Sequence, residues 1–491
     1  MKTILRIVSL CMALALLFGS VIVLAGDVTK ITKDVYQYAD VPAPDEEGII
    51  SDMNAILPND EYKVSWLSNH GGGQTRMLYT TTGLYFGLFT GEDADAPVIG
   101  INLFHIEEDG SARSVYETSM PYTGSGPMVS VMADKAGNVW MFSGWQVEVE
   151  EAPKLRYLFN MWKYDPTTGT TEEYSELKTY ATAKIGSYGS GGYAVTSIDE
   201  ENGRIFALVN CCDKPGYMEW SLFDMKTCTW SDLRAVKIDY RYCYSYIVPD
   251  GNGGFHIFNQ RDVTVGSVKT DIGKSVESSA RNTHTSWYDN NMLFDEWDYF
   301  HIANAEVDEL NEQFAVEPAT YEVAKGLYPD FSADSSDVFM DSKGYLHFIY
   351  TGHENLTYGN RFVHVVYDVS GATAVEVNRQ TFNCASTSMH NFYGRCYEDT
   401  EGNFYVVAVR SVSTPLEIEI WGASDPTKDL ELLYAEAITK YPGLQAAGTA
   451  VASSRNGSIM SDIMYLGIYS YEIKWYYYTV DFAKLRAFLA R

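Results

Sequence analysis

Basic residues are scarce in this chain, and several short motifs of common catalytic sites are missing. Lysine and arginine together number 36 against 65 aspartates and glutamates, which gives a formal net charge of −29. Because phosphate binding needs a basic surface, this balance excludes nucleic acid as an expected partner. No glycine-rich nucleotide loop and no nucleophile elbow occurs either, so neither a nucleotide cofactor nor a hydrolase built on that elbow is expected.

Cysteine is also rare, with seven residues whose spacings fit no zinc motif. An acidic extracellular chain would suit calcium, but no loop supplies the series of oxygen ligands that calcium requires. We therefore expect no metal and no other cofactor. Cys384 and Cys396 are close enough in sequence to form a disulfide. Disulfides and buried thiols both remain open for the other cysteines beyond the N-terminal stretch, which are Cys211, Cys212, Cys228 and Cys243.

The N-terminus has the pattern of an export signal. Lys2 and Arg6 precede an apolar stretch over 7–17, and the small or medium residues at 23–25 suit a signal peptidase. We therefore predict a signal peptide over 1–25 and an extracellular, secreted protein. The alternative is an uncleaved membrane anchor, because the apolar run is nearly long enough to span a bilayer. Nothing later resembles a transmembrane helix, so no membrane contact is expected of the mature chain.

A hairpin repeats along nearly the whole chain. The hairpin consists of an apolar strand, a turn with Asp or Asn and Gly, and a second apolar strand. It recurs at intervals of roughly fifty to sixty residues. Glycine serves where the turn places a residue at positive φ, and Asp or Asn caps the turn with its side chain. The instances are 79–86, 134–140, 199–206, 250–256, 341–347, 399–405 and a degenerate one at 455–457.

A second hairpin follows each first one. Two hairpins form a four-stranded antiparallel sheet, which is one blade of a β-propeller. The sequence therefore predicts an all-β fold, a seven-bladed β-propeller of four-stranded antiparallel blades, and we expect a monomer. The turns of the second hairpins lie near Glu108, Asp165, Asp224, Asp308, Asp368 and Asp425.

The domain boundaries follow from the repeats. The propeller is expected over 61–482, with a long loop insertion at about 260–290 that is rich in Ser, Thr, Asp and Asn. Residues 26–60 are expected to form a lead-in segment that donates a strand to close the ring. Residues 483–491 are expected to form a short C-terminal tail with a helix.

The blade pattern also predicts which loops share a face. In a propeller the turns between strands A and B, and between C and D, lie on one face. The Asp-Gly turns therefore lie on this plain face, and their carboxylates are interpreted as caps rather than catalytic acids. The opposite face, called the loop face below, collects residues just before strand A and just after strand B. Five histidines are expected inside strands, where they pack between blades: His105, His256, His301, His347 and His364.

The loop face holds an unusual set of candidate residues. Several arginines of an otherwise acidic chain fall there, together with four of its nine histidines. Ligand sites in closed β architectures gather at such mouths. The candidates are His353, Tyr358 and Arg361 in the fifth blade, His390, Tyr393 and Arg395 in the sixth, and Arg261, Arg410, His70, His284, Trp145 and Trp287 elsewhere.

The segment D-S-K-G-Y-L-H-F-I-Y-T-G-H-E-N-L-T-Y, which begins at Asp341, resembles the BNR-type repeats of secreted sialidase-like propellers, including some propeller polysaccharide lyases. The resemblance implies a carbohydrate-active protein with a polysaccharide or glycan as partner. Two departures argue against sialidase activity. The spacing of Asp134, Gly137 and Trp140 differs from a sialidase Asp box, and the Arg-Ile-Pro signature of the sialidase arginine triad is absent.

These candidates would suit a lyase that cleaves a uronate-containing polysaccharide by β-elimination. A cation must neutralise the uronate carboxylate, and Arg361, Arg395 or Arg261 is available. The base is then His353 or His390, since histidine titrates near neutral pH. The acid that protonates the leaving oxygen is Tyr393 or Tyr358. The remaining arginine, histidines and tryptophans of the set, which are Arg410, His70, His284, Trp145 and Trp287, would bind substrate.

Two other functions stay open from the sequence. The same face would serve a non-catalytic propeller that binds a glycan or a protein, because propellers host many unrelated functions. A glycosidase would need paired carboxylates such as Asp262, Glu354 or Asp289, but no pair is fixed in spacing. Whether the protein is an enzyme is therefore undecided at this level, and a polysaccharide lyase is the expected class if it is one.

Overall fold

The computed structural model describes most of the chain after residue 47. The described residues are 48–51, 54–56, 75–90, 98–107, 110–121, 128–151, 154–181, 191–211, 217–238, 242–261, 263–264, 292–293, 297–317, 337–353, 360–384, 392–410, 416–441, 444, 446–470 and 474–491.

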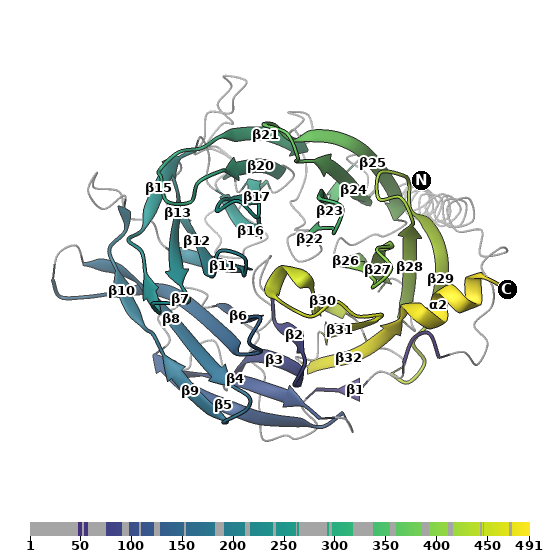
Figure 1. Ribbon diagram of the computed structural model, residues 1–491, viewed down its shortest axis with the longest axis horizontal. Helices are drawn as coiled ribbons and strands as arrows, with labels where there is room; N and C mark the ends of the chain where they lie inside the picture. Colours follow the sequence, from purple (N-terminus) through teal and green to yellow (C-terminus); the bar gives the residue numbers. More distant parts are fainter. Residues whose placement is uncertain are drawn as a thin grey trace, which may run out of the picture.

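Seven antiparallel sheets surround a central channel, so the predicted seven-bladed propeller is confirmed (Figure 1). The first strand of each blade lines the channel, and the later strands follow outward. Blade 1 comprises β2 (Met77–Thr80), β3 (Gly83–Thr90), β4 (Val98–Ile106) and β5 (Ala112–Pro121). Blade 2 comprises β6 (Met128–Ala133), β7 (Val139–Glu148) and β8 (Leu155–Asp165), with an outer edge split into β9 (Thr170–Glu173) and β10 (Glu176–Lys178).

Blades 3 and 4 each add a feature to this plan. Blade 3 comprises β11 (Gly191–Asp199), β12 (Arg204–Cys211) and β13 (Tyr217–Asp224), and both β14 (Thr229–Trp230) and β15 (Arg234–Lys237) pair with β13. Blade 4 comprises β16 (Tyr242–Pro249), β17 (Phe255–Arg261), β20 (Trp297–Ile302) and β21 (Glu312–Glu317). Its long insertion starts and ends in a small hairpin of β18 (Val263–Thr264) and β19 (Met292–Leu293).

The last three blades complete the ring. Blade 5 comprises β22 (Asp337–Met340), β23 (Tyr345–His353), β24 (Asn360–Asp368) and β25 (Val375–Cys384). Blade 6 comprises β26 (Phe392–Glu398), β27 (Phe404–Arg410), β28 (Glu417–Ala423) and β29 (Glu431–Ala437). Blade 7 takes its three inner strands from the C-terminal part of the chain, as β30 (Ala446–Val451), β31 (Ile463–Ser470) and β32 (Lys474–Asp481).

The outer strand of blade 7 comes from the other end of the chain. β1 (Asn54–Ala55) pairs with β32, with Asn54 opposite Tyr477. The ring is therefore closed by main-chain hydrogen bonds between segments more than 400 residues apart in sequence. Helix α2 (Phe482–Leu489) follows β32 directly, and the side chain of Asp481 accepts a hydrogen bond of 3.0 Å from the backbone N–H of Lys484, as a helix N-cap does.

The hydrophobic core lies between neighbouring blades. Strand side chains alternate between the two faces of a sheet, so each blade buries both faces against its neighbours. Phe258 of blade 4 stacks on Phe348 of blade 5 with ring centroids 4.1 Å apart. Trp140 of blade 2 meets Phe223 of blade 3 edge to face at 5.5 Å. Such pairs add about 0.5–1.5 kcal/mol each to the burial of their area, and they hold the blade angles that position the loops.

The carboxylates of the Asp-Gly turns are caps, as the sequence analysis proposed. Asp399 Oδ1 accepts from the backbone N–H of Asn403 at 2.9 Å, and its Oδ2 accepts from the hydroxyl of Tyr405 at 3.0 Å. Gly402 supplies the positive φ of 77° that the turn requires. The carboxylate thus caps its own turn, and it also contacts Arg486 of α2. The same two bonds recur for Asp134 with Asn138 and Trp140, and for Asp341 with Tyr345 and His347.

Two expectations need correction. Cys396 is a free, buried thiol, so the proposed disulfide between Cys384 and Cys396 is wrong. Its position inside β26 places it in the core between blades 5 and 6, where burial raises the pKa of the thiol well above its usual range. The second correction concerns 455–457. They form no tight hairpin turn but part of a longer connection over 452–462 that includes the short 3-10 helix η9 (Ser454–Asn456).

The remaining expectations about the termini and the insertion fall outside the described residues. The predicted signal peptide at 1–25 and most of the lead-in at 26–60 belong to that part, as does 265–291 of the blade 4 insertion. Within the described part of the chain, no helix has both the length and the apolar character needed to cross a membrane.

Candidate functional site

The plain-face end of the central channel is occupied by the connection between β30 and β31. In Figure 1 this yellow segment lies inside the ring. Asn456 Nδ2 donates to the carbonyls of Met77 at 2.7 Å and Val131 at 3.2 Å, on the inner strands of blades 1 and 2. Ser197 Oγ on the inner strand of blade 3 donates to the carbonyl of Arg455 at 3.1 Å. The connection thereby ties blade 7 to the three blades across the channel.

Gly457 is required by this close approach. Its φ is +80°, and a Cβ at this position would lie 2.0 Å from the carbonyl oxygen of Ala133. No other residue would let the turn pack against β6 without moving backbone.

The η9 turn sends the side chain of Arg455 toward a layer of charged residues in the channel. Asp337, the first residue of β22, has Oδ1 3.6 Å from Arg455 Nη2 and 3.7 Å from Arg395 Nη1. Its Oδ2 accepts a hydrogen bond of 2.9 Å from the backbone N–H of Cys396. Arg395 also donates from Nε to Thr449 Oγ1 at 2.9 Å. Blades 5, 6 and 7 are thus linked through one carboxylate and two guanidinium groups.

This layer is buried and carries an excess of positive charge. The side chains of Arg455 and Arg395 are 3% and 9% exposed, and that of Asp337 is 2% exposed. Arg455 Nε and Nη1 and Asp337 Oδ1 make no hydrogen bond among the described residues. Burial lowers the pKa of the Arg455 guanidinium, and the carboxylate of Asp337 acts in the opposite direction. An arginine stays protonated under these conditions, because its intrinsic pKa lies so high.

A further arginine occupies an equivalent position in blade 1. Arg76 is 5% exposed, and its guanidinium carbon lies 6.0 Å from the ring centroid of Trp475, which is a cation–π distance. Arg76, Asp337 and Arg395 each stand four residues before the first turn residue of their blade, which is Thr80, Asp341 or Asp399. Aligning the inner strands on their turns would have revealed this layer from the sequence. Asp337 and Arg455 were not among the residues that the sequence marked as candidates.

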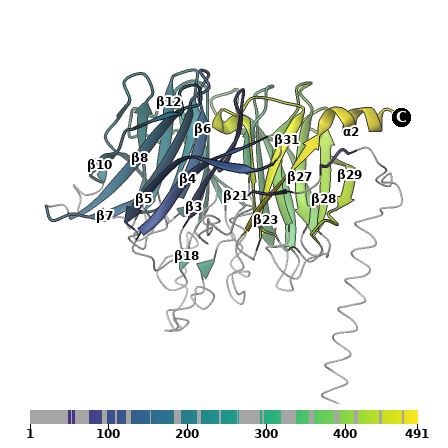
Figure 2. The same cartoon turned by 90° about the horizontal axis from the view of Figure 1, so that it is seen from below.

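The layer lies beneath the loop face. Asp337 begins β22, and the first residue of an inner strand is at its loop-face end. Arg395 is three residues into β26, which corresponds to about 10 Å along the strand from its loop-face end. Figure 2 shows the two faces: α2 follows a strand end on the plain face, and β18 projects from the loop face.

Among the described residues, some of the predicted site residues lie at or near strand ends on that loop face. His353 is the last residue of β23 and pairs with Asn360 across the hairpin. Tyr393 is the second residue of β26, and Arg410, at the end of β27, pairs with Phe392 beside it. Blades 5 and 6 are neighbours, since β22 contacts β26. The backbone positions of His353, Tyr393 and Arg410 therefore share one face and two adjacent blades.

Several predicted positions differ from those expected. The sequence analysis placed Arg395 and Tyr393 before an inner strand, and both lie inside β26. Arg361 lies in β24, the third strand outward, so it is further from the channel than His353 and Tyr393. Arg261 is the last residue of β17, and Trp145 lies within β7; both strands are the second of their blade. The remaining candidates lie outside the described residues: His70, Tyr358, His390, His284 and Trp287, together with the possible acids Asp262, Glu354 and Asp289.

Three of the five strand histidines, His256, His347 and His364, are buried inside strands, as expected. His347 and His364 are fully buried, with His347 Nδ1 3.0 Å from His364 Nε2. His347 Nε2 lies 3.3 Å from Asp341 Oδ2, and the His347 ring stacks on Phe404 at 3.8 Å. If His347 donates its Nε2–H to the carboxylate of Asp341, its Nδ1 is left to accept a hydrogen bond from His364 Nε2–H. Burial lowers the pKa of both histidines, so they stay neutral in the folded protein.

Comparisons with known proteins yield structural neighbours only. No family model matches the chain, and no curated protein matches it. A polysaccharide lyase, Uly1, superposes with a TM-score of 0.47 and 11% identity, covering 89% of this chain and 96% of that one. A PL25 ulvan lyase bound to -[GlcA(1-4)Rha3S]- superposes with a TM-score of 0.43 and 11% identity, covering 83% and 93%. The intramolecular trans-sialidase from Ruminococcus gnavus superposes with a TM-score of 0.39 and 11% identity, covering 88% of this chain and 98% of that one.

Proposed function

We propose that the protein is a secreted, carbohydrate-active propeller that binds a uronate-containing polysaccharide on its loop face and cleaves it by β-elimination. The observation that carries the proposal is the excess of buried guanidinium groups beneath this face, formed by Arg395 and Arg455 around Asp337. A chain with a net charge of −29 would otherwise repel an anionic polymer.

The position of these charges suits attraction of an anion. A buried unit charge about 10 Å below the surface, at an effective dielectric constant of about 20, contributes on the order of 1–2 kcal/mol to a carboxylate above it. Salt screens such buried charges less than exposed ones. The η9 turn occupies the plain-face end of the channel, so the field is directed toward the loop face. The buried arginines would attract the polymer without touching it.

The chemistry itself would fall to residues at the strand ends. In β-elimination, a base removes the proton from the carbon next to the uronate carboxylate. The electron pair forms a carbon–carbon double bond, the glycosidic carbon–oxygen bond breaks, and an acid protonates the leaving oxygen. His353 or His390 is proposed as the base and Tyr393 or Tyr358 as the acid. Arg410, Arg361 or Arg261 would neutralise the carboxylate, since Arg395 is engaged with Thr449 and Asp337.

The test follows the double bond that elimination creates. The purified protein is incubated with a panel of uronate polysaccharides, and the ultraviolet absorbance of unsaturated uronate ends is recorded. We expect absorbance to rise with at least one polymer, and to stay flat for whichever of His353→Ala and His390→Ala removes the base and whichever of Tyr393→Phe and Tyr358→Phe removes the acid. Tyr345→Phe, on the plain face at the start of β23, is the matched control and should keep full activity.

Two other results would revise the proposal. A flat absorbance across the panel, with binding retained in sedimentation or calorimetry, would leave the site as a non-catalytic binder. A flat absorbance with no binding of any anionic polymer would overturn the proposed function altogether.

A further inference from the structure

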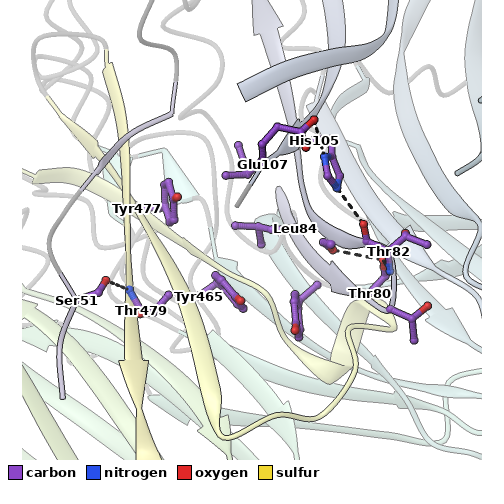
Figure 3. A pocket seen from close by; sticks show the side chains of 13 residues that line it. Ser51, Thr80, Thr82, Leu84, His105, Glu107, Tyr465, Tyr477 and Thr479 are labelled. Carbon is purple, nitrogen blue, oxygen red and sulfur yellow. Dashed lines mark hydrogen bonds and ion pairs between the residues drawn. The ribbon is translucent and has the colours of Figure 1, made fainter. Parts of the chain in front are cut away.

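A pocket with a volume of about 930 Å³ lies on the plain face, between blades 1 and 7 (Figure 3). It is next to the ring closure, because Ser51 of the N-terminal segment and Thr479 of β32 both line it. The backbone N–H of Thr479 donates to Ser51 Oγ at 2.8 Å. Its size falls within the range of small-molecule sites in proteins. The proposed lyase site uses none of its residues.

The pocket is unusually rich in hydroxyl groups. Of its 13 lining residues, eight carry one: three tyrosines, four threonines and one serine. Tyr79 and Tyr465 lie side by side, with ring centroids 4.7 Å apart and an interplanar angle of 34°. Burial raises the pKa of Tyr465 to about 12, so its hydroxyl keeps its proton at neutral pH and remains a donor. The lining thus combines flat apolar rings with many groups that both donate and accept hydrogen bonds.

The charge of the pocket excludes an anionic ligand. Among the described residues that line the pocket, Glu107 is the one carboxylate, and none is a lysine or an arginine. Hydrogen bonds from Arg113 and His105 lower the pKa of Glu107, so it is ionised at neutral pH. Arg113, which is not in the lining, already pairs with this carboxylate at 2.7 Å, so a phosphate or a uronate would find no further cation among the described lining residues. The charge pattern is therefore opposite to that of the channel beneath the loop face.

The polar side of the pocket is held in a fixed shape. His105 bridges two oxygens, with Nε2 2.9 Å from the carbonyl of Thr82 and Nδ1 3.2 Å from Glu107 Oε1. The ring reaches this position because residue 83 is glycine. Gly83 has a φ of +125°, and a Cβ there would lie 2.4 Å from His105 Nε2. Figure 3 shows the imidazole between the Thr82 backbone and the Glu107 side chain.

The aromatic side is fixed equally well. Tyr79 N–H donates to Ser458 Oγ at 3.1 Å, and its carbonyl accepts from the N–H of Ile459 at 2.9 Å. These bonds tie the start of blade 1 to the blade 7 connection that also carries η9. Both sides of the pocket are therefore preformed, so a ligand would not have to order them.

We propose that this pocket is a second carbohydrate site, which binds the end of a neutral oligosaccharide on the face opposite the proposed lyase site. A neutral pyranose offers several hydroxyls to the threonines, the imidazole and the carboxylate, and a C–H face to the tyrosine rings. Since the pocket spans the first and last blades, an occupied site also stabilises the ring closure. This inference is independent of the lyase proposal, because it concerns other residues and uncharged ligands.

The test fills the pocket without disturbing its walls. Thr81 lines the pocket and is exposed in the turn between β2 and β3, so Thr81→Trp should fold normally and block entry. Thr168→Trp places the same side chain on an exposed turn of blade 2, outside the pocket, and is the matched control. Wild-type protein and both variants are titrated calorimetrically with neutral gluco-, manno-, galacto- and xylo-oligosaccharides, and their melting temperatures are recorded with each.

We expect at least one neutral oligosaccharide to bind wild type and Thr168→Trp with a Kd below about 1 mM and to raise their melting temperatures. Thr81→Trp should lose at least tenfold in affinity. The proposal is overturned if none of these sugars binds, or if Thr81→Trp binds as well as Thr168→Trp. Absence of lyase activity in the same preparation would not bear on the result, because the two faces are assayed with different ligands.

Discussion

Arg455 and Asp337 meet in the central channel although 118 positions separate them in the chain, with Arg455 Nη2 3.6 Å from Asp337 Oδ1. The arginine descends from the η9 turn of blade 7, and the carboxylate begins the inner strand of blade 5. Asp337 also faces Arg395 and the N–H of Cys396. One carboxylate therefore compensates two buried guanidinium groups, which makes it the most sensitive charge in the channel.

Removal of that carboxylate should destabilise the propeller strongly. In Asp337→Ala, Arg395 and Arg455 stay buried without a counter-charge, and breaking a buried pair in this way costs about 3–5 kcal/mol. We expect a loss of this size in the free energy of unfolding, measured by urea denaturation. Asp368→Ala, at the end of β24, removes only a carboxylate that caps a turn and should cause a much smaller loss.

The double variant Asp337→Ala with Arg455→Met separates charge from packing. In Asp337→Ala the guanidinium groups of Arg395 and Arg455 repel each other. Removing one of them together with the carboxylate relieves this repulsion, so the double variant should be more stable than Asp337→Ala alone. A double variant that is less stable than the single one would show that Arg455 stabilises the channel independently of Asp337.

The buried arginines should also set the affinity for anionic polysaccharide. Arg395→Met removes one positive charge beneath the loop face, and a change of about 1.4 kcal/mol corresponds to tenfold in the dissociation constant. We expect a loss of roughly this size, with a rise in KM rather than a fall in kcat. Arg204→Met is the control, since Arg204 pairs with Glu306 on the plain face. Equal losses in the two variants would argue against a role of the channel charge.

The paired histidines predict a decline of stability in acid. His347 and His364 are neutral in the folded protein because burial lowers the pKa of each. In the unfolded chain both bind protons below the ordinary value of 6.5. The unfolded state therefore binds more protons as the pH falls, and the free energy of unfolding drops by up to about 1.4 kcal/mol per pH unit for each histidine.

The variant His364→Leu isolates this contribution. It leaves His347 Nδ1 without its donor, so it is less stable at neutral pH, but it titrates one proton fewer. Urea unfolding at a series of pH values from 7.5 down to about 5 should give a shallower dependence on pH than wild type. Parallel curves would mean that His364 is already charged in the folded protein.

Gly83 offers a direct test of the pocket geometry. In Gly83→Ala the methyl group would lie 2.4 Å from His105 Nε2, and an alanine at φ +125° is strained. We expect a loss of about 1–3 kcal/mol in the free energy of unfolding and a weaker affinity for neutral oligosaccharides, as His105 is displaced. Gly169→Ala, which also has a positive φ of 69° but no atom near its Cβ, is the control. Its affinity should equal that of wild type, and a loss there would implicate general strain.

The sequence was informative wherever structure depends on neighbours in the chain. Each Asp-Gly turn is a local unit, because the carboxylate, the N–H groups that it caps and the left-handed glycine lie within seven residues, as in Asp399 to Tyr405. Six hairpin turns, five of them with Asp, together with the degenerate unit at 455–457 indicate seven blades, and the number of blades fixes the ring. His256 and His347 were placed correctly for the same reason, since each stands six residues after the Asp of its turn.

Strand ends on the loop face were harder to place. Tyr393 and Arg395 were expected before the inner strand, but the polar residues around them gave no sign that the strand starts at Phe392. That boundary depends on pairing with β27, where Phe392 lies opposite Arg410. Likewise, proximity in sequence suggested a disulfide for Cys396, whereas the blade 5 interface buries its thiol.

By itself, the sequence determined the repeat, the turns and the order of the blades, because these depend on contacts within a few residues. The tertiary structure alone decided that Arg455 would reach Asp337, that Ser51 would join Thr479, and that Tyr79 would lie beside Tyr465. Each of these pairs joins different blades or opposite ends of the chain. Their meeting is set by the closure of the ring, which brings distant residues together only after every blade has packed against the next.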